Sequence, residues 1–337
     1  MTRRIDRVEE WDAYVADAPG ATFCHLAAWR DIMADVLGHE WIPLVAVGED
    51  GRWRGVLPLV RVRSRLFGHH LISMPFLNYG GPLGDEVARR GLVDAAIDEA
   101  RRSGARSLEL RARAAVPCAL PPGRSKITVL LDLPPDPDAL WRDRFPSKLR
   151  SQIRRPLKEG MTARFGLDQV EPFYDVFARN MRDLGTPVLP LRFFVRIAER
   201  FADRVVFATV RRQDAPVAAG CGFVWRDEFE ITWASSLREH NPSAPNMLLY
   251  WSLMQRMAER GVRVFNFGRC SPGGGTHRFK RQWGGVDAPL PWVRWSAGGA
   301  APPAPEQGVY RVASAVWRRL PVNVARRLGP FFARGLP

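Results

Sequence analysis

Apolar residues recur along this chain at two spacings, one of three to four residues and one that alternates or forms short runs. In the first part of the chain, this pattern predicts two helices, a hairpin turning at Asp50-Gly51, a strand ending in glycines, a helix and two more strands. In order, these elements are expected at residues 7–18, 26–37, 41–50, 52–64, 70–83, 86–103, 106–112 and 127–133.

The second part of the chain repeats much of this order. Two helices, three successive strands, a loop, a helix with Asn246 as its N-cap, and a strand are expected. They cover residues 169–183, 191–202, 204–212, 216–226, 228–237, 247–260 and 262–268. Residues 101–111 and 258–269 both place a glycine and an arginine between a helix end and a strand. This parallel favours an internally duplicated α/β unit.

The proline-rich segment at 133–140, LPPDPDAL, is the best candidate for a boundary between the two parts. We therefore expect an α/β protein of mixed sheets in two tandem domains, residues 1–135 and 136–297. Residues 298–337 are expected to form a Pro/Gly linker and a basic tail.

The tail has no acidic residue from Gln307 onward, and Val309, Val312, Val316 and Leu320 share one helical face. This pattern is typical of an amphipathic helix lying on a membrane surface. Packing of the tail onto the second domain is the alternative.

The net charge of +15 favours anionic partners, such as nucleic acid, nucleotide-linked substrates or an acidic membrane. Arginine supplies 46 of the 50 basic residues, however, and a GC-rich genome would produce the same bias. Lysine occurs only at Lys126, Lys148, Lys158 and Lys280. Because an ammonium and a guanidinium are not interchangeable, each lysine is informative.

Several classes of protein are disfavoured. The four cysteines have no spacing typical of zinc or disulfide frameworks, and we expect no metal site. No apolar run is long enough for a membrane span, and the amino terminus has no secretory pattern, so a cytoplasmic location is expected. Aromatic residues are sparse among the basic ones at 148–158, which argues against sequence-specific DNA binding.

The segment at 267–285, FGRCSPGGGTHRFKRQWGG, stands out from its surroundings. Its three glycines lack the spacing of a P-loop and no helix is expected after them, so they are interpreted as a turn between strands.

Five motifs resemble those of FemAB-like proteins, in particular the branch associated with exosortase and PEP-CTERM exopolysaccharide systems. They are NYGGPL, SKLRSQIRRPLKEG, HNPSAPNMLLYW, the segment at 267–285 and the ending RRLGPFFARGLP. The resemblance implies twin GNAT-like domains and transfer of an acyl or aminoacyl group to an amine, or a hydroxyl, of a lipid- or nucleotide-linked envelope precursor. The donor would be acyl-CoA or aminoacyl-tRNA, with no tightly bound cofactor.

Acyl transfer to an amine passes through an oxyanion, which a positioned cation stabilises. Lys280 follows Phe279 and matches the Phe-Lys pair of the family, so the resemblance implies that both line the transfer site. His277 and Glu230 are weaker candidates for a general base. Residues expected to bind substrate are Tyr79, Lys148, Arg150, His240, Asn246, Arg269, Thr276 and Trp283.

Three alternatives remain at the level of the sequence. Phe279 and Trp283 are also compatible with a place in the core, and Lys280 with a surface charge. The chain is also compatible with a non-catalytic accessory protein of polysaccharide export or with an acyl-CoA-dependent GNAT enzyme. The loop before residue 247 lacks the glycine pattern of acetyl-CoA enzymes, which weakens the last reading.

Overall fold

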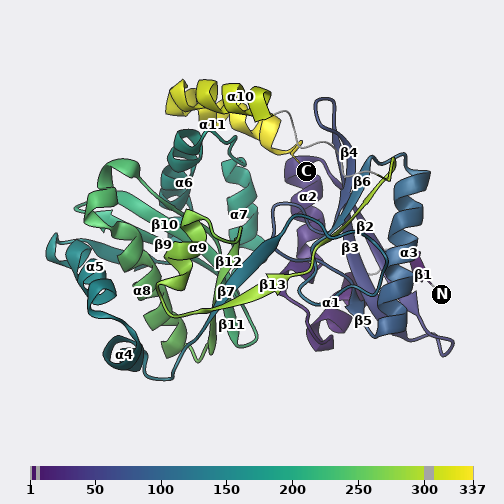
Figure 1. The fold of residues 1–337 in the computed structure, drawn as a ribbon, viewed down its shortest axis with the longest axis horizontal. Helices are drawn as coiled ribbons and strands as arrows, with labels where there is room; N and C mark the ends of the chain where they lie inside the picture. The colour runs from purple at the N-terminus through teal and green to yellow at the C-terminus, as the bar shows by residue number, and fades with distance from the viewer. Residues whose placement is uncertain (1, 5–7, 300–306, 337) are drawn as a thin grey trace. The chain divides into compact units, whose positions relative to one another are not determined.

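The computed structural model describes residues 2–4, 8–299 and 307–336, with the backbone alone at 3 and 307–310 (Figure 1). The chain divides into two compact units. Unit 1 comprises residues 1–127, 289–304 and 334–337, and unit 2 comprises residues 128–288 and 305–333. Val309 of the predicted tail stripe and residues 300–306 of the linker lie outside what is described at side-chain level.

Unit 1 is built on a mixed sheet in the order β1-β2-β3-β4-β6-β14, with β5 beside β3. Neighbouring residues of a strand point to opposite faces, so Trp41 contacts Trp11 of α1 whereas Ile42 joins the cluster under α3. The elements of unit 1 are β1 (Thr2–Arg4), α1 (Val8–Asp17), η1 (Phe23–His25), α2 (Ala28–Leu37), β2 (Glu40–Val47), β3 (Trp53–Ser64), β4 (Gly68–Ile72), β5 (Leu83–Gly84), α3 (Glu86–Arg102), β6 (Ser107–Leu110) and β14 (Val293–Ser296).

Unit 2 has a second mixed sheet, in the order β13-β7-β12-β11-β10-β9-β8. Tyr250 of α8 packs on Phe265, while Phe194 of α7 packs on Trp233. The elements of unit 2 are β7 (Lys126–Asp132), α4 (Pro137–Ala139), η2 (Leu140–Arg144), α5 (Ser147–Lys158), β8 (Thr162–Phe165), η3 (Leu167–Gln169), α6 (Val170–Leu184), α7 (Leu191–Arg200), β9 (Val205–Arg212), β10 (Ala215–Trp225), β11 (Glu228–Ser236), η4 (Arg238–Ser243), α8 (Pro245–Glu259), β12 (Val264–Cys270), α9 (Gly275–Arg281), β13 (Val286–Leu290), α10 (Gln307–Arg319) and α11 (Val322–Ala333).

The predicted duplication is present in the backbone. Each unit runs through three antiparallel strands, a helix and a strand that pairs in parallel with the third, β4 with β6 and β11 with β12. The helix-to-strand joints also match, because Gly104 and Gly261 both adopt positive φ. The residue after each glycine donates its N–H to a carbonyl five residues earlier, which is the Schellman arrangement.

The order of helices and strands agrees with the predicted pattern, and five details differ. The strand expected at 70–83 ends at Ile72, after which Met74 and Phe76 take positive φ. The strand at 127–133 joins the sheet of unit 2 through β12 and β13, so the compact units part at 127/128 rather than 135/136. The segment after Pro289 returns to unit 1, where β14 pairs with β6.

The other two differences concern the segments around α8 and α9. The glycine run leads into helix α9, not into a turn between strands. Asn246 lies in the first turn of α8 and is not its N-cap, because the helix begins at Pro245 after Ala244. A proline at the first helical position suits the helix start, since its missing N–H would have no intrahelical partner.

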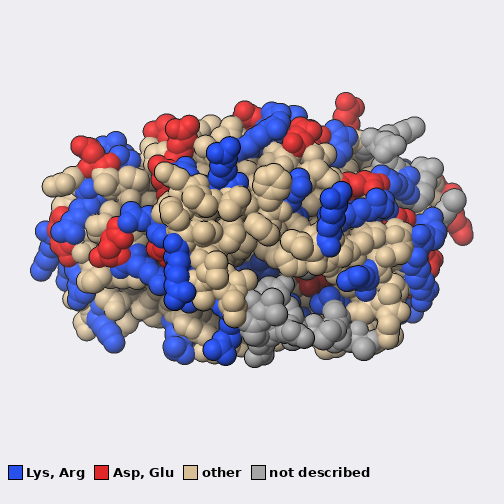
Figure 2. Space-filling model, turned by 90° about the horizontal axis from the view of Figure 1, so that it is seen from above, with Lys and Arg blue, Asp and Glu red and all other residues tan. Residues whose placement is uncertain are grey.

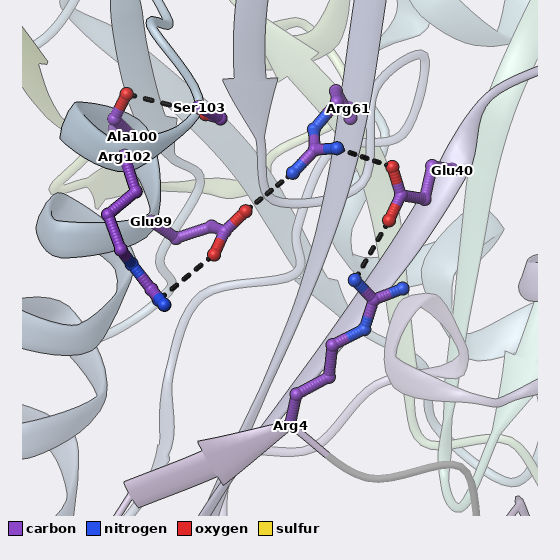
Figure 3. Close-up of polar contacts among 7 residues, drawn as sticks. All are labelled: Arg4, Glu40, Arg61, Glu99, Ala100, Arg102 and Ser103. Carbon is purple, nitrogen blue, oxygen red and sulfur yellow. Dashed lines mark hydrogen bonds and ion pairs between the residues drawn. The ribbon is translucent and has the colours of Figure 1, made fainter.

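Charged side chains are dispersed over the protein. Figure 2 shows Lys and Arg spread across one face with Asp and Glu among them. Many arginines make local ion pairs, and several of these pairs join into one network in unit 1 (Figure 3). There Arg61 bridges Glu40 at 2.6 Å and Glu99 at 2.5 Å, linking β2, β3 and α3. Such pairs account for part of the arginine content without any external partner.

Candidate functional site in unit 2

Two parallel strands of unit 2 separate after a short stretch of pairing. β11 and β12 are in register only from Glu228 and Val264 to Glu230 and Asn266. Beyond that point β11 continues beside β10 and β12 beside β7. Thr232 has no counterpart in β10, since Cys221 pairs with Trp233 and Gly222 with Ile231. A bulge of this kind bends its strand, which accounts for the divergence of β11 from β12.

Buried polar side chains gather where the strands part. Asn266 and Glu230 face each other in register, and both are almost fully buried. Asn266 donates to Glu228 at 2.7 Å, and its carbonyl oxygen accepts from Thr128 of β7 at 2.5 Å. Thr232 donates to the Glu230 carboxylate at 3.0 Å. Because buried polar groups are costly unless hydrogen-bonded, this arrangement holds the side chains in fixed positions.

Lys280 reaches the same region from α9. Its Nζ donates to the carbonyl oxygens of Gly268 at 2.6 Å and Arg269 at 3.0 Å, and the side chain is buried. Gly268 has a φ of 68°, a conformation that favours glycine, at the point where its carbonyl meets the ammonium. Burial lowers the pKa of Lys280 to about 8, while Cys270 and the Glu230 carboxylate oppose the shift. The reading of Lys280 as a surface charge is therefore excluded.

The glycine run is tied to α9 by His277. The Gly273 N–H donates to Nδ1 of His277 at 3.0 Å, so Nε2 carries the proton and donates to Asp287 at 3.0 Å. Arg278 closes the loop by donating to the Gly273 carbonyl at 2.9 Å. With both ring nitrogens engaged, the geometry favours a tethering role for His277 over that of a general base.

Aromatic side chains pack behind Lys280. Trp283 is buried between Phe145 and Phe267, which places it in the core. Phe279 is only partly buried and meets Tyr250 edge-on, with ring centroids 5.0 Å apart. Of the two predicted contact aromatics, Phe279 retains accessible surface.

The other predicted binding residues of unit 2 are spread over several elements. Arg269 lies on β12, and its carbonyl accepts from Lys280, while Thr276 is exposed on α9. His240 lies in η4, close in sequence to Asn246 at the start of α8. Of these residues, Arg269 lies beside Lys280, and its charge and that of Glu230 both act on the pKa of Lys280.

Lys148 and Arg150 lie on α5, whose opposite face is buried. Lys148 is exposed, and Arg150 donates to the Trp141 carbonyl at 3.0 Å. A cavity of 340 Å³ borders the same helix. It is lined by Ser151, Arg154, Arg155, Lys158 and Glu159.

Tyr79 belongs to unit 1. There β4 and β6 correspond to β11 and β12, and residues 73–81 occupy the place beyond their ends. Tyr79 is buried beneath the Arg113 guanidinium, 4.9 Å from its ring centroid. Residues 73–81 fold across the ends of β4 and β6, and Arg111 donates to the carbonyls of Met74 and Leu77. The buried ammonium at diverging strands is thus a feature of unit 2.

Sequence reasoning missed Asn266, Thr128 and Gly268. Asn266 was detectable as a polar residue in the apolar strand VFNFG, and Thr128 as one in ITVLL. Their joint role depends on β7 lying beside β12, a pairing between segments 138 residues apart. Within the described part of the chain, no three His, Cys, Asp or Glu residues are grouped as a metal site.

Residues 144–281 match the family model described as acetyltransferase (GNAT) domain. The match contains α5 to α9 and ends one residue after Lys280. A curated relative is the UDP-N-acetylmuramoylpentapeptide-lysine N(6)-alanyltransferase of Weissella viridescens, 24% identical over 136 residues. That alignment covers 38% of this chain and only 40% of the relative.

Two solved structures share the fold over most of the chain. The crystal structure of FemX has a TM-score of 0.65 at 15% identity and covers 93% of this chain and 100% of its own. A tandem GNAT protein from the clavulanic acid biosynthesis pathway has a TM-score of 0.50 at 13% identity and covers 89% and 100%. The expected fold class is confirmed: the chain has a mixed α/β fold shared with FemX and a tandem GNAT protein, and residues 144–281 are similar to an acetyltransferase (GNAT) domain.

Proposed function

We propose that this protein is an acyl- or aminoacyltransferase whose reaction takes place where β11 and β12 part, beside Lys280. The observation that carries the proposal is the buried Lys280 ammonium, fixed by two carbonyls in the matched domain. An ammonium has three N–H donors, so one remains after these two bonds. A fixed donor of this kind costs no reorganisation when negative charge develops on a substrate oxygen.

The proposed step is attack of an amine, or a hydroxyl, on the carbonyl carbon of the donor. A bond forms from the nucleophile to carbon, and the carbonyl oxygen becomes an oxyanion that accepts the remaining Lys280 N–H. Collapse breaks the bond to the ester oxygen of an aminoacyl-tRNA or the thioester sulfur of an acyl-CoA. The proton of the nucleophile passes to the leaving group. Glu230 is buried, and its charge acts on the pKa of Lys280. It is therefore the candidate to relay this proton.

Aminoacyl-tRNA is the donor we favour, because the curated relative is named as an alanyltransferase and the fold is shared with FemX. In this proposal the exposed basic face of α5, including Lys148, holds donor phosphates. Acyl-CoA is the second candidate, favoured by the match to an acetyltransferase (GNAT) domain. Incubation with a charged tRNA pool and an acyl-CoA pool separates them, because only the true donor is deacylated when an amine acceptor is added.

The proposed acceptor is a lipid- or nucleotide-linked envelope precursor, since the named relative acts on a UDP-linked muramoyl pentapeptide. The sequence motifs support an exosortase-associated exopolysaccharide setting, and a lipid-linked acceptor would bring the protein to the inner membrane face. In the described part of the chain, no helix is both long and apolar enough to cross a bilayer.

Lys280→Met tests the enzyme proposal against a non-catalytic accessory role. Methionine keeps the length and removes the donor, so we expect transfer to fall by about 100-fold or more, the range for loss of one oxyanion donor. The matched control is Arg52→Met in the exposed turn between β2 and β3 of unit 1, which removes a cation outside the matched domain and leaves the ammonium of Lys280 in place. Transfer by Lys280→Met at the wild-type rate, with an unchanged melting temperature, would exclude the proposed mechanism.

A further inference from the structure

Helix α11 presents its large apolar side chains to solvent. Val324, Leu328 and Phe331 follow one another at the i, i+4, i+7 spacing of a single helical face. All three are exposed, Phe331 at 70%. In a surface helix such a stripe ordinarily faces the core, so the orientation of α11 is the reverse of the usual one.

Small residues form the opposite face of α11. Ala325, Gly329 and Ala333 are the buried positions of the helix. A Cβ at Gly329 would lie 2.9 Å from the Val188 backbone, which shows how closely the helix approaches unit 2. Arg326 pairs with Asp175 of α6 at 2.8 Å. These contacts fix the rotation of α11 and hold the apolar stripe outward.

Helix α10 has the same character. Val312 and Val316 are exposed, at 65% and 54%, while Ser314 lies against Gly185 at the end of α6. Both α10 and α11 contact α6. The sequence predicts that the tail either packs on the second domain or presents an amphipathic face outward. Its geometry is compatible with both, because one face of each helix packs on unit 2 and the other carries exposed apolar side chains.

Charge selects the partner of this surface. From residue 307 to 337 the chain has six arginines and no acidic residue. Arg311, Arg318, Arg319 and Arg327 are exposed on the two helices. Figure 2 views the protein from the side on which α10 and α11 lie in Figure 1; blue side chains border tan surface there, with red side chains among them. Each arginine near an anionic lipid surface adds electrostatic attraction.

We infer that the outward face of α10 and α11 docks on an anionic lipid bilayer, with the apolar side chains entering the interface and the arginines contacting lipid phosphates. Below, "tail surface" means Val312, Val316, Val324, Leu328 and Phe331 with the four exposed arginines. Apolar area and positive charge together are what interfacial helices use. This inference rests on the proposed function in one respect: a lipid-linked acceptor would give the protein a reason to bind a membrane.

Sedimentation of the full chain with vesicles tests the inference. Vesicles contain either phosphatidylcholine alone or two parts of it to one part of phosphatidylglycerol. We expect binding to the anionic vesicles only, weakened by salt. The triple variant Val324→Ser, Leu328→Ser, Phe331→Ser should lower the partition by about 10-fold or more, since three apolar side chains no longer enter the interface.

Two controls make the result specific. Leu66→Ser replaces a side chain of unit 1 that is 71% exposed, and it should leave vesicle binding unchanged. Circular dichroism melting checks that the triple variant is folded. Unchanged binding by a folded triple variant would overturn the inference. So would a wild-type dimer in lipid-free ultracentrifugation that the triple variant abolishes, because the partner would then be a second copy.

Failure of this inference is separable from failure of the proposed function. Vesicle binding needs no donor, and Lys280→Met should bind vesicles like the wild type. A protein that transfers to a water-soluble amine but ignores vesicles would disprove the tail surface alone. A protein that binds vesicles but transfers nothing would disprove the reaction alone.

Discussion

Lys280 is one of four lysines in a chain that uses arginine almost everywhere else, and its surroundings explain the choice. Nζ approaches the carbonyls of Gly268 and Arg269 as a compact point charge. A guanidinium is larger and planar, so it would not fit these contacts.

The pKa of Lys280 leads to a prediction about pH. Burial lowers it from 10.5 to about 8, so the ammonium is the main form below pH 8 and the neutral amine above it. If the ammonium stabilises the oxyanion, the transfer rate should fall as pH rises through about 8. The measurement is the rate of a single turnover from pH 6.5 to 9.5. With hydroxylamine as the acceptor, which is largely neutral throughout this range, a rate that only rises would argue for Lys280 acting as a base.

Arg61 is expected to stabilise unit 1 through two carboxylates, as Figure 3 shows. Its side chain and that of Glu99 are only 13% and 16% exposed, so loss of the cation leaves a poorly solvated negative charge. Arg61→Met should lower the free energy of unfolding by about 1–3 kcal/mol. The comparison is Arg90→Met, whose pair with Glu86 is 3.6 Å apart and exposed, and which should cost under about 1 kcal/mol. Equal effects in urea unfolding would contradict the prediction.

At the scale of elements, the two glycine joints explain how each unit turns from helix into parallel strand. Gly104 and Gly261 have φ of 67° and 79°, and a Cβ at either would meet no atom within 4 Å. Only backbone conformation therefore requires glycine at these joints. A single Schellman turn, used twice, gives α3-β6 and α8-β12 the same geometry.

Alanine at either joint should destabilise the protein by about 1 kcal/mol, because the left-handed conformation costs an L-residue roughly that amount. Gly275→Ala is the matched control, since this glycine has ordinary φ, lies in α9 and also has open space at its Cβ. It should be neutral or slightly stabilising. Melting temperatures of the three variants measure the difference, and a loss as large at Gly275 would disprove the conformational explanation.

At the scale of the whole molecule, buried histidines are unevenly divided between the units. All four histidines of unit 1 have lowered pKa values, with burial as the largest cause; His25, His39 and His70 are buried, and His69 is partly buried. For His25 and His39 the pKa falls to about 4. The remaining two histidines, His240 and His277, lie in unit 2.

Acid should therefore unfold unit 1 first. Between pH 6.5 and 4 the unfolded chain binds the protons that folded His25 and His39 refuse, so stability is complete above 6.5 and falls with pH in this window. The loss approaches about 3 kcal/mol for His25 alone. Hydrogen exchange at pH 7 and pH 5 should show faster opening of β2, β3 and α3 than of β9 and β10. Uniform acceleration in both units would contradict this.

The sequence by itself determined most of the elements, their order and their repetition. Apolar periodicity, the glycine at each joint and the glycine turn after residue 50 are local signals, and local backbone preferences decide what they form. The motif around Lys280 also identified the region of the candidate site. The prediction of a turn at its glycine run was wrong. The helix that follows, α9, is held by contacts of His277 with Gly273 before the helix and with Asp287 after it.

Only the tertiary structure decided which segments meet. β7 lies beside β12 and β14 beside β6, pairings between segments far apart in the sequence that no local pattern encodes. The contact of Asn266 with Thr128 follows from the first of these pairings. The outward orientation of α11 likewise depends on the close approach of Gly329 to Val188. Helical periodicity specifies that a helix has an apolar face, and packing against the rest of the chain decides where that face points.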